Sequence, residues 1–367
     1  MFGARIENLK RNMVKQEVDV LALNGGPTLS YFTGLHFHLM ERPVVLLLPV
    51  DNDPVIILPE LELAKLEDLP VFADVFSYGE NPDTWYGVAA DAMTSLAGKK
   101  KKIAVEPVWL RFLEYELLRR GCPEAEFIDG SGLVARLRSI KDGGELAHMR
   151  KAVRIAEDAL EATLGSVREG VKEEEVASEL FLQLLRHGSE PDLPFSPIVS
   201  SGPNGANPHA RPSERKLCRG DLLVIDWGAR YNGYVSDLTR TFGIGELDSE
   251  TEQVYQLVKS ANEAGRNAGG PGVACSAVDR GARNVIETGG YGRFFSHRTG
   301  HGLGLECHEP PFIRGDNMEV LRPGMTYTVE PGIYLAGRNG VRIEDDVVVT
   351  QSGVESLSTM SRELRYL

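Results

Sequence analysis

The sequence lacks several features that define whole classes of protein. Its N-terminal stretch, MFGARIENLKRNMVKQE, contains no apolar core of the kind that a secretory signal requires. The longest apolar run, VVLLLPV at 44–50, has the length of a strand and is too short to span a membrane. The 4 cysteines are scattered and form no CxxC pair, which favours reduced thiols over a disulfide framework. We therefore expect a cytoplasmic protein with no membrane partner.

The chain also lacks any block of basic residues. It has 53 acidic side chains against 40 lysines and arginines, which gives a formal net charge of −13. Nucleic acids attract clustered Lys and Arg, so we expect no nucleic-acid partner. The acidic excess either serves solubility or reflects carboxylates that bound metal neutralises. A length of 367 residues suits two domains of ordinary globular composition.

Periodicity divides the chain into two domains. Within 1–137, short runs rich in Val, Ile and Leu alternate with segments of helical spacing, which predicts an α/β domain. The expected strands are 18–24, 44–50, 54–59 and 102–107, and the expected helices are 5–15, 61–66, 83–96 and 108–120. The polar, glycine-containing stretch 138–144 is the expected linker. An amphipathic helix from 145 to about 167 opens the second domain, 145–367, where further helices are expected at 172–187, 249–267 and 277–288.

A weak internal repeat places acids at the ends of apolar strands. The segment GDLLVIDWG at 220–228 parallels GMTYTVEPG at 324–332, and the two strands end in Asp226 and Glu330. A second acid follows each copy after another strand-like segment, Asp237 in the first and Glu344 in the second. Two strand pairs that each deliver two carboxylates predict a pseudo-symmetric sheet with four acids at its centre.

These acids are costly to bury unless a cation accompanies them. A turn-forming role is sufficient for Asp226 alone, because Asp before Gly often forms a turn. For the four acids together, bound divalent metal is the more economical explanation. The glycine-rich segment HRTGHGLGLECHEPP at 297–311 adds His301 as an imidazole ligand. An oxygen-rich site of this kind suits Mn²⁺ or Co²⁺, with Fe²⁺ or Zn²⁺ as alternatives. Four acids exceed the needs of one ion, so we expect two, about 3.5 Å apart.

Several segments together resemble the M24 family of metallopeptidases, which has the pita-bread fold, and specifically its Xaa-Pro branch of prolidases and aminopeptidases P. They are IDWGARYNGYVSDLTRTF at 225–242, HRTGHGLGLECHEPP at 297–311, TVEPGIY at 328–334, GVRIEDDVVVT at 340–350 and, on the substrate side, PFSPIVSSGPNGANPHARPS at 194–213. The N-terminal domain, with SYFTGL at 30–35, is similar to the creatinase-like domain of that family. The resemblance implies an α+β fold, with a creatinase-like α/β domain before a pita-bread catalytic domain, and a homodimer.

The same resemblance implies a metal-binding role for each of five residues. Asp226 would chelate one ion, Asp237 and Glu344 would bridge the two ions, and His301 and Glu330 would hold the second. A water between the ions would attack the scissile carbonyl. Glu330 would accept its proton and pass it to the leaving proline nitrogen.

Other residues of the resemblance are expected around the substrate. His209 and His308 would contact the substrate and stabilise the tetrahedral intermediate, and His297 would line the pocket. Arg342 would either orient the carboxylate two positions after it or face solvent as an ordinary strand arginine. Cys307 is interpreted as a packing residue. Of the neighbouring Asp345 and Asp346, at most one should point inward, because side chains alternate along a strand. His36 and His38 are candidates to reach the active site of a partner subunit.

The leading functional hypothesis is a dinuclear metallopeptidase that cleaves the bond before proline in Xaa-Pro dipeptides, that is, a prolidase. A second hypothesis is an Xaa-Pro aminopeptidase acting on longer peptides. A dipeptidase needs a cation for the substrate carboxylate, and Arg314 does not match the position where some prolidases place one. Two further hypotheses are a non-peptidase pita-bread enzyme, creatinase-like or lyase, and a binding module. The full set of five ligands counts against the creatinase-like enzyme and the binding module, whereas a metal-retaining lyase stays open.

Overall fold

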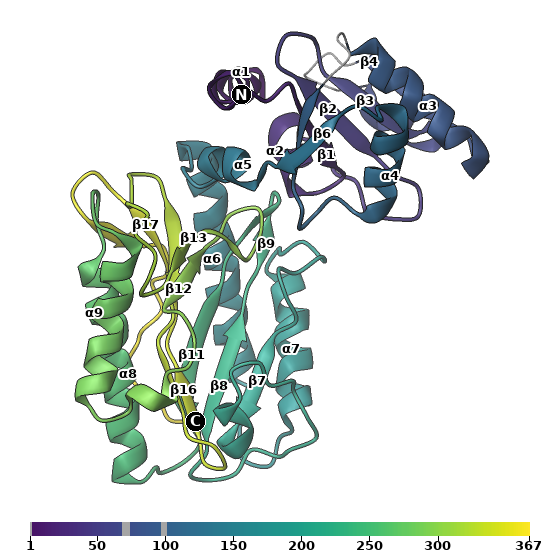
Figure 1. Cartoon of the computed structure of the whole chain (residues 1–367). Coiled ribbons are helices and arrows are strands. Elements are labelled where there is room, and N and C mark those ends of the chain that lie inside the picture. The colour runs from purple at the N-terminus through teal and green to yellow at the C-terminus, as the bar shows by residue number, and fades with distance from the viewer. Residues whose placement is uncertain (1, 68–73, 97–100) are drawn as a thin grey trace. The chain divides into compact units, whose positions relative to one another are not determined.

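The computed structural model describes residues 2–67, 74–96 and 101–367, and the chain divides into two compact units, Met1–Arg138 and Ser139–Leu367. The N-terminal unit contains a six-stranded sheet of order β4-β3-β2-β1-β5-β6 (Figure 1). Its strands are β1 Val20–Asn24, β2 Val45–Pro49, β3 Val55–Pro59, β4 Asp74–Tyr78, β5 Lys102–Val105 and β6 Glu126–Asp129. The central strand β1 is antiparallel to β2 and parallel to β5. Strands β1, β2 and β3 are buried throughout, which explains their nearly continuous apolar sequences.

The helices of this unit follow the predicted pattern in part. They are α1 Phe2–Gln16, α2 Pro27–Thr33, the 3-10 helix η1 Glu60–Leu66, α3 Pro82–Ser95, α4 Phe112–Gly121 and α5 Ser131–Arg138. The segment predicted as a helix at 61–66 is therefore a 3-10 turn rather than an α-helix. The helix predicted from 108 begins at Phe112. Two helices, α2 and α5, and two strands, β4 and β6, were not predicted.

The C-terminal unit consists of two similar halves, each a helix pair followed by strands. The first half contains α6 Gly143–Leu164, α7 Glu173–Arg186, β7 Ile198–Ser201, η2 Gly202–Ala206, β8 Leu222–Trp227, β9 Arg230–Tyr231, β10 Tyr234–Val235 and β11 Leu238–Gly243. The second contains α8 Ser249–Ala268, α9 Cys275–Thr288, η3 Gly292–Phe294, β12 Gly300–Gly302, β13 Glu309–Ile313, β14 Thr326–Val329, β15 Gly332–Tyr334, β16 Gly340–Arg342, β17 Asp345–Val349 and β18 Val354–Ser356. Figure 1 shows α8 and α9 at one flank of the strands and α7 at the other.

Helix α6 begins earlier than its apolar periodicity indicates. The Asp142 side chain accepts a hydrogen bond from Glu145 N (2.9 Å), and the Glu145 carboxylate accepts one from Asp142 N (2.8 Å). This reciprocal capping box starts the helix at Gly143, inside the stretch 138–144 expected as a linker. Only residues 139–142 separate α5 from α6, so the expected linker is too long.

The strands of the two halves repeat one another. Strand β8 pairs antiparallel with β11, and β14 pairs antiparallel with β17 in the same manner. Along the chain, the two strands of each pair are separated by a short two-stranded sheet, formed by β9 and β10 in the first half and by β15 and β16 in the second. An isolated bridge between Thr239 and Glu344 joins the two larger sheets, of orders β11-β8-β7 and β13-β12-β14-β17-β18. The weak sequence repeat thus corresponds to a structural one.

Two findings bear on the classes excluded above. All 4 cysteines lie within the described residues and are free thiols. No helix in the described stretches 2–67, 74–96 and 101–367 has both the length and the apolar character that crossing a membrane requires.

Candidate metal centre and active site

The four predicted acids meet where the strand pairs of the two halves end. Asp226 is the penultimate residue of β8, and Asp237 immediately precedes its partner β11. Glu330 directly follows β14, and Glu344 directly precedes its partner β17. Because neighbouring antiparallel strands begin and end side by side, each pair brings its two acids together. The bridge from Thr239 to Glu344 then joins the pairs.

Possible ligand atoms lie close together in three overlapping groups, within 4.8 Å of one another in each group. The groups are Asp226 with Asp237 and Glu344, His301 with Glu330 and Glu344, and Asp237 with His301 and His308. The structure therefore brings together all five residues expected to bind metal. It also places His308 beside them, with its ring centroid 4.2 Å from that of His301.

Close strand packing orients the imidazole of His301. Its Nδ1 lies 3.2 Å from the Gly302 carbonyl, which can only accept, so Nδ1 carries the proton of that hydrogen bond. Nε2 faces Oε1 of Glu330 at 3.2 Å and Oδ2 of Asp237 at 3.6 Å. A Cβ atom on Gly300 would lie 1.8 Å from the Thr328 carbonyl oxygen, so only glycine fits before His301. This geometry leaves Nε2 directed at the acids.

The acid cluster carries more negative charge than its surroundings compensate. Burial raises the pKa of Asp226, although Arg342 opposes this effect. Burial, followed by repulsion from neighbouring carboxylates, raises the pKa of Asp237 and of Glu344 well above their usual ranges. For Glu330, burial also acts upward, but the hydrogen bond and charge of His301 outweigh it and lower the pKa to about 2.

The chemistry of the donors fits divalent metal. Oδ1 of Asp226 is buried and has no hydrogen-bond partner among the described residues, although a buried carboxylate oxygen normally has one. The remaining donors are carboxylate oxygens and one imidazole nitrogen, a set that suits hard or borderline divalent ions. Cations at this position would remove the repulsion and pair the unsatisfied oxygen, so the residues present fit such ions.

The cluster forms one wall of a cavity of about 560 Å³. The histidines expected around the substrate also line it, namely His209, His297 and His308. Burial and the positive charges of His301 and Arg298 lower the pKa of His308 to about 4, so its imidazole is neutral at neutral pH. Both nitrogens of His297 are engaged, Nδ1 with the Arg298 carbonyl and Nε2 with the Tyr334 hydroxyl, each at 2.8 Å. His297 therefore forms a wall of the cavity and has no ring nitrogen left for a ligand.

Comparisons with known proteins match both units of the chain to known families. Residues 147–351 match the model of metallopeptidase family M24, and residues 5–140 match that of the creatinase/prolidase N-terminal domain. The chain belongs to metallopeptidase family M24. This M24 metallopeptidase is 33% identical to an Xaa-Pro dipeptidase of Lactobacillus delbrueckii subsp. lactis, over 99% of the chain and 98% of the relative.

Solved structures extend the similarity to both units of the M24 metallopeptidase. A prolidase from Thermococcus sibiricus has a TM-score of 0.93 at 35% identity, covering 100% of this chain and 99% of that one. A dipeptidase from Pyrococcus horikoshii OT3 has a TM-score of 0.92 at 39% identity, covering 99% and 100%. The predicted fold class, an α+β pita-bread unit preceded by a creatinase-like one, is confirmed.

Arg342 binds one carboxylate of the M24 site directly and is linked to the expected one, Glu344, through a threonine. Its Nη2 donates to Oδ2 of Asp226 (2.6 Å), and its Nη1 donates to the Tyr334 hydroxyl (3.0 Å). Its Nε donates to Thr239 Oγ1 (3.1 Å), and this hydroxyl donates to Oε2 of Glu344 (2.6 Å), so Arg342 is linked to Glu344 through Thr239. Arg342 is only 3% exposed, so the alternative of a solvent-facing arginine is wrong.

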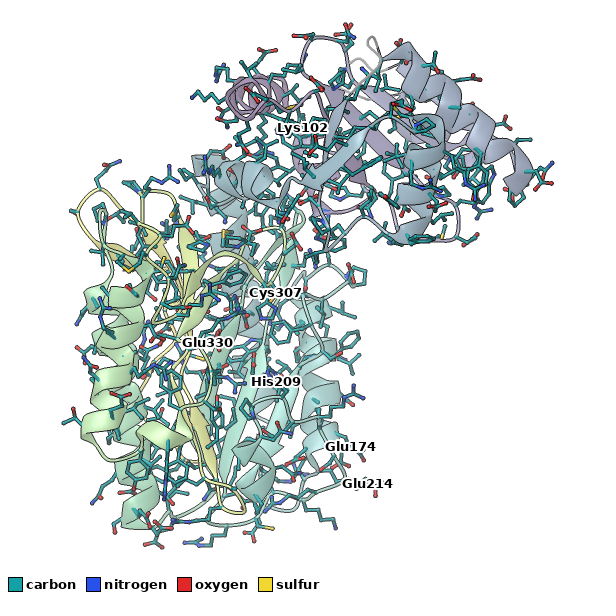
Figure 2. All side chains as sticks on the ribbon, in the orientation of Figure 1. Lys102, Glu174, His209, Glu214, Cys307 and Glu330 are labelled. Carbon is teal, nitrogen blue, oxygen red and sulfur yellow. The ribbon has the colours of Figure 1, made fainter. Side chains whose placement is uncertain are left out.

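Cys307 does more than pack. Its Sγ donates to Oδ2 of Asp237 at 3.0 Å, and the side chain lines the cavity. In the view of Figure 2, Cys307, His209 and Glu330 lie toward the middle of the C-terminal unit's outline, whereas Glu174 and Glu214 lie at its edge. An apolar residue at position 307 would fill the space without this hydrogen bond, so the interpretation of Cys307 as a packing residue was incomplete.

The two aspartates that follow Glu344 alternate as expected for a strand. Asp345 turns away from the cluster, toward Nη2 of Arg240 (2.8 Å) and Nε of Arg362 (2.6 Å). Asp346 points the other way, and its Oδ2 accepts a hydrogen bond from Asp237 N (3.1 Å). Neither belongs to the groups of possible ligand atoms among the described residues.

Sequence reasoning missed Glu173, which anchors the segment that carries His209. The Glu173 carboxylate is 0% exposed and accepts hydrogen bonds from Ser201 N (2.7 Å) and Ser213 N (3.1 Å), one at each end of that segment. The hydroxyls of both serines and the Asn204 amide donate to it as well. Glu173 lies among three consecutive glutamates at a helix start, so its sequence context gave no signal of this role.

Proposed function

We propose that this M24 metallopeptidase hydrolyses the peptide bond before proline in Xaa-Pro dipeptides, with two divalent ions held by Asp226, Asp237, His301, Glu330 and Glu344. The observation that carries the proposal is the convergence of these five side chains on one wall of a cavity of about 560 Å³. The substrate class comes from the similar proteins, which include an Xaa-Pro dipeptidase and a prolidase.

The overlap of the ligand groups indicates how the five residues would be shared between the two ions. Glu344 belongs both to the group of Asp226 and to that of Glu330, and Asp237 belongs both to the group of Asp226 and to one of His301. Asp237 and Glu344 are the carboxylates that occur in two of these groups, so they would be the residues that bridge the ions. Mn²⁺ or Co²⁺ is the proposed pair, with Fe²⁺ or Zn²⁺ as alternatives. When bound, the ions supply Lewis acidity to the scissile carbonyl and lower the pKa of a water molecule.

Glu330 is the proposed proton carrier. Thr328 Oγ1 donates to Oε1 of Glu330 at 3.2 Å, which limits the rotation of the carboxylate. Glu330 accepts the proton of the attacking water and delivers it to the proline nitrogen as the peptide bond breaks. His308 is neutral and donates one N–H to the developing oxyanion. His209, exposed on the segment that Glu173 anchors, closes on the substrate from another side of the cavity.

Metal analysis and substrate comparison test the proposal together. Purified protein should hold about two ions per chain and hydrolyse Leu-Pro when Mn²⁺ is present. Glu330→Gln should fold normally and lose at least about 100-fold in kcat. Glu214→Gln, a matched change in an exposed side chain at the periphery, should leave kcat unchanged.

Three results would count against the proposal in different ways. Fewer than one ion per chain, with no activity gained from Mn²⁺ or Co²⁺, would contradict the dinuclear site. Turnover of Xaa-Pro-Pro tripeptides without turnover of dipeptides would make the enzyme an aminopeptidase. An active Glu330→Gln variant would refute the assigned proton carrier. The cytoplasmic location and the homodimer stay predictions. Light scattering, which measures the molar mass in solution, tests the homodimer.

A further inference from the structure

The short segment between α5 and α6 places a lysine in the interior of the C-terminal unit. Nζ of Lys141 donates to Oε1 of Glu309 at 2.6 Å, and the two side chains are only 1% and 6% exposed. The segment is anchored within the same unit, because Lys141 N donates to the Gly324 carbonyl (2.9 Å) and Ile140 forms an isolated bridge with Met325. The stretch expected to be a polar linker therefore supplies a buried cation.

Close packing holds this ion pair in one geometry. A Cβ atom on Gly304 would lie 2.8 Å from both Oε1 of Glu309 and Cε of Lys141, so the backbone packs directly on the pair. A buried ion pair adds little net stability, because desolvation offsets much of the attraction. It resists rearrangement, however, since separating the charges leaves each one buried and uncompensated. Such a pair therefore fixes the position of the backbone that carries it.

The backbone that carries Glu309 also carries His308. Glu309 is the first residue of β13, directly follows His308 and pairs with Gly302 of β12. His308 lines the cavity, whereas Glu309 is not one of the described residues that do so. The two neighbours thus point in different directions, Glu309 toward Lys141 in the interior and His308 into the cavity. Holding the first side chain directs the second.

The imidazole of His308 has no hydrogen bond of its own to any described residue that would orient it. Its ring packs edge-on against that of His301, with the centroids 4.2 Å apart. The ring of His297, in contrast, is held by hydrogen bonds at both nitrogens. The direction of the His308 ring therefore depends on its backbone, and so on the pair that fixes this backbone.

We propose that Lys141 is a positioning residue for catalysis, because through Glu309 it holds His308 where its N–H meets the developing oxyanion. This inference rests on the proposed function, since the oxyanion forms in that reaction. Lys141 is not one of the described residues that line the cavity, so it acts through Glu309 rather than on the substrate. A donor aimed at developing charge acts mainly in the transition state, so its misplacement lowers kcat more than it raises KM.

The test removes the ammonium and keeps most of the apolar stem. In the Mn²⁺-loaded enzyme, Lys141→Met should lower kcat for Leu-Pro about tenfold or more and change KM by less than about threefold, with the metal content unchanged. In a His308→Ala background the same substitution should change kcat by less than about twofold, because no imidazole is left to position. Lys259→Met is the matched control, since Lys259 pairs with the exposed Glu363 (2.8 Å) at the surface and its loss should leave kcat and KM unchanged.

A second variant covers the case in which Lys141→Met does not fold. Combining Lys141→Met with Glu309→Gln removes both buried charges together, so no uncompensated charge remains. This double variant should fold and show the same loss of kcat. Wild-type kcat in the folded double variant would overturn the inference. So would a loss of kcat from Lys141→Met that is equally large with and without His308, because this loss would not pass through the imidazole.

Nuclear magnetic resonance follows the His308 ring without any substrate. The Zn²⁺-loaded protein is labelled with ¹⁵N, and His308→Ala assigns the ring signals. The wild type should show one sharp set of them, and Lys141→Met should shift and broaden that set. Unchanged His308 signals in the variant would overturn the inference. Should the wild type hydrolyse no Xaa-Pro peptide, the proposed function fails separately, and the ring signals still decide whether Lys141 holds His308.

Discussion

Glu173→Gln is the substitution whose cost the structure defines most closely. Each carboxylate oxygen of Glu173 accepts a backbone N–H, Oε1 from Ser201 and Oε2 from Ser213. Glutamine has one carbonyl oxygen and one NH₂ group, so either orientation of its amide points a donor at one of these buried N–H groups. The serine hydroxyls can rotate and become acceptors, but a backbone N–H cannot.

The expected loss of stability follows from this count. A buried donor left without an acceptor costs about 1–3 kcal/mol. Replacing a charged acceptor by a neutral one weakens the remaining hydrogen bonds and adds about 1 kcal/mol. We therefore expect Glu173→Gln to lower the free energy of unfolding by about 2–4 kcal/mol. Because Ser201 and Ser213 flank the segment that carries His209, we also expect KM to rise and kcat to fall.

Urea denaturation of the metal-loaded protein measures the first effect, and steady-state kinetics on Leu-Pro measures the second. Glu174→Gln is the matched control, since the neighbouring Glu174 pairs with Lys172 at the surface (3.1 Å) and should change stability by less than about 0.5 kcal/mol. A loss below about 1 kcal/mol for Glu173→Gln would refute the reasoning, because it would mean that the orphaned N–H finds another acceptor.

Three further predictions concern charge at and around the site. Burial acts to raise the pKa of Asp345, but the arginines beside it hold that pKa well below its usual range. A group whose pKa is depressed on folding stabilises the protein above its unfolded-state pKa of about 3.9, and this stability is lost as pH falls toward the folded-state pKa. Asp345→Asn should therefore lower the free energy of unfolding by about 3 kcal/mol at neutral pH and by less below about pH 4. The pKa values of Asp237 and Glu344 are raised, so they affect the pH dependence of stability in the opposite direction, and the metal-free protein should lose stability as pH rises. The gain in Tm from Mn²⁺ should therefore grow between about pH 5 and 8. Arg342→Lys should weaken metal binding about 10–100-fold in a chelator competition, because the single nitrogen of lysine cannot reach Asp226, Tyr334 and Thr239, which three separate guanidinium nitrogens contact.

Each of these predictions has an outcome that contradicts it. A pH-independent difference between wild type and Asp345→Asn would mean that the depressed pKa does not contribute to stability. A gain in Tm from Mn²⁺ that is constant with pH would show that the acids are already ionised in the metal-free protein. Arg342→Lys with wild-type metal affinity would show that Asp226 keeps its position without the guanidinium.

The fold was predictable where a segment shows one buried and one exposed face. Helix α6 has such a face and was found, whereas its first residues depend on the cap between Asp142 and Glu145 rather than on periodicity. In α2, five of the seven residues are buried, and this leaves no helical period to detect. Strands β4 and β6 lie at the two edges of their sheet and are partly exposed, so they lack the apolar runs that identified β1, β2 and β3.

The site residues were predictable where the neighbouring sequence is unusual for the residue type. Acids at the ends of apolar strands stand out, and the repeat paired Asp226 with Glu330. The contact between Arg342 and Asp226 could not be predicted from the sequence in this way, because it depends on how β16 lies against β8.

The bridge between Thr239 and Glu344 has a consequence for the order of events in the cell. The two residues are 105 positions apart, and their hydrogen bond closes the centre between the two halves. A growing chain that has completed only the first half presents Asp226 and Asp237 without the other three donors. With the proposed five ligands, metal loading is expected to follow synthesis of both halves, so that the completed cavity rather than a nascent polypeptide selects among competing cellular ions.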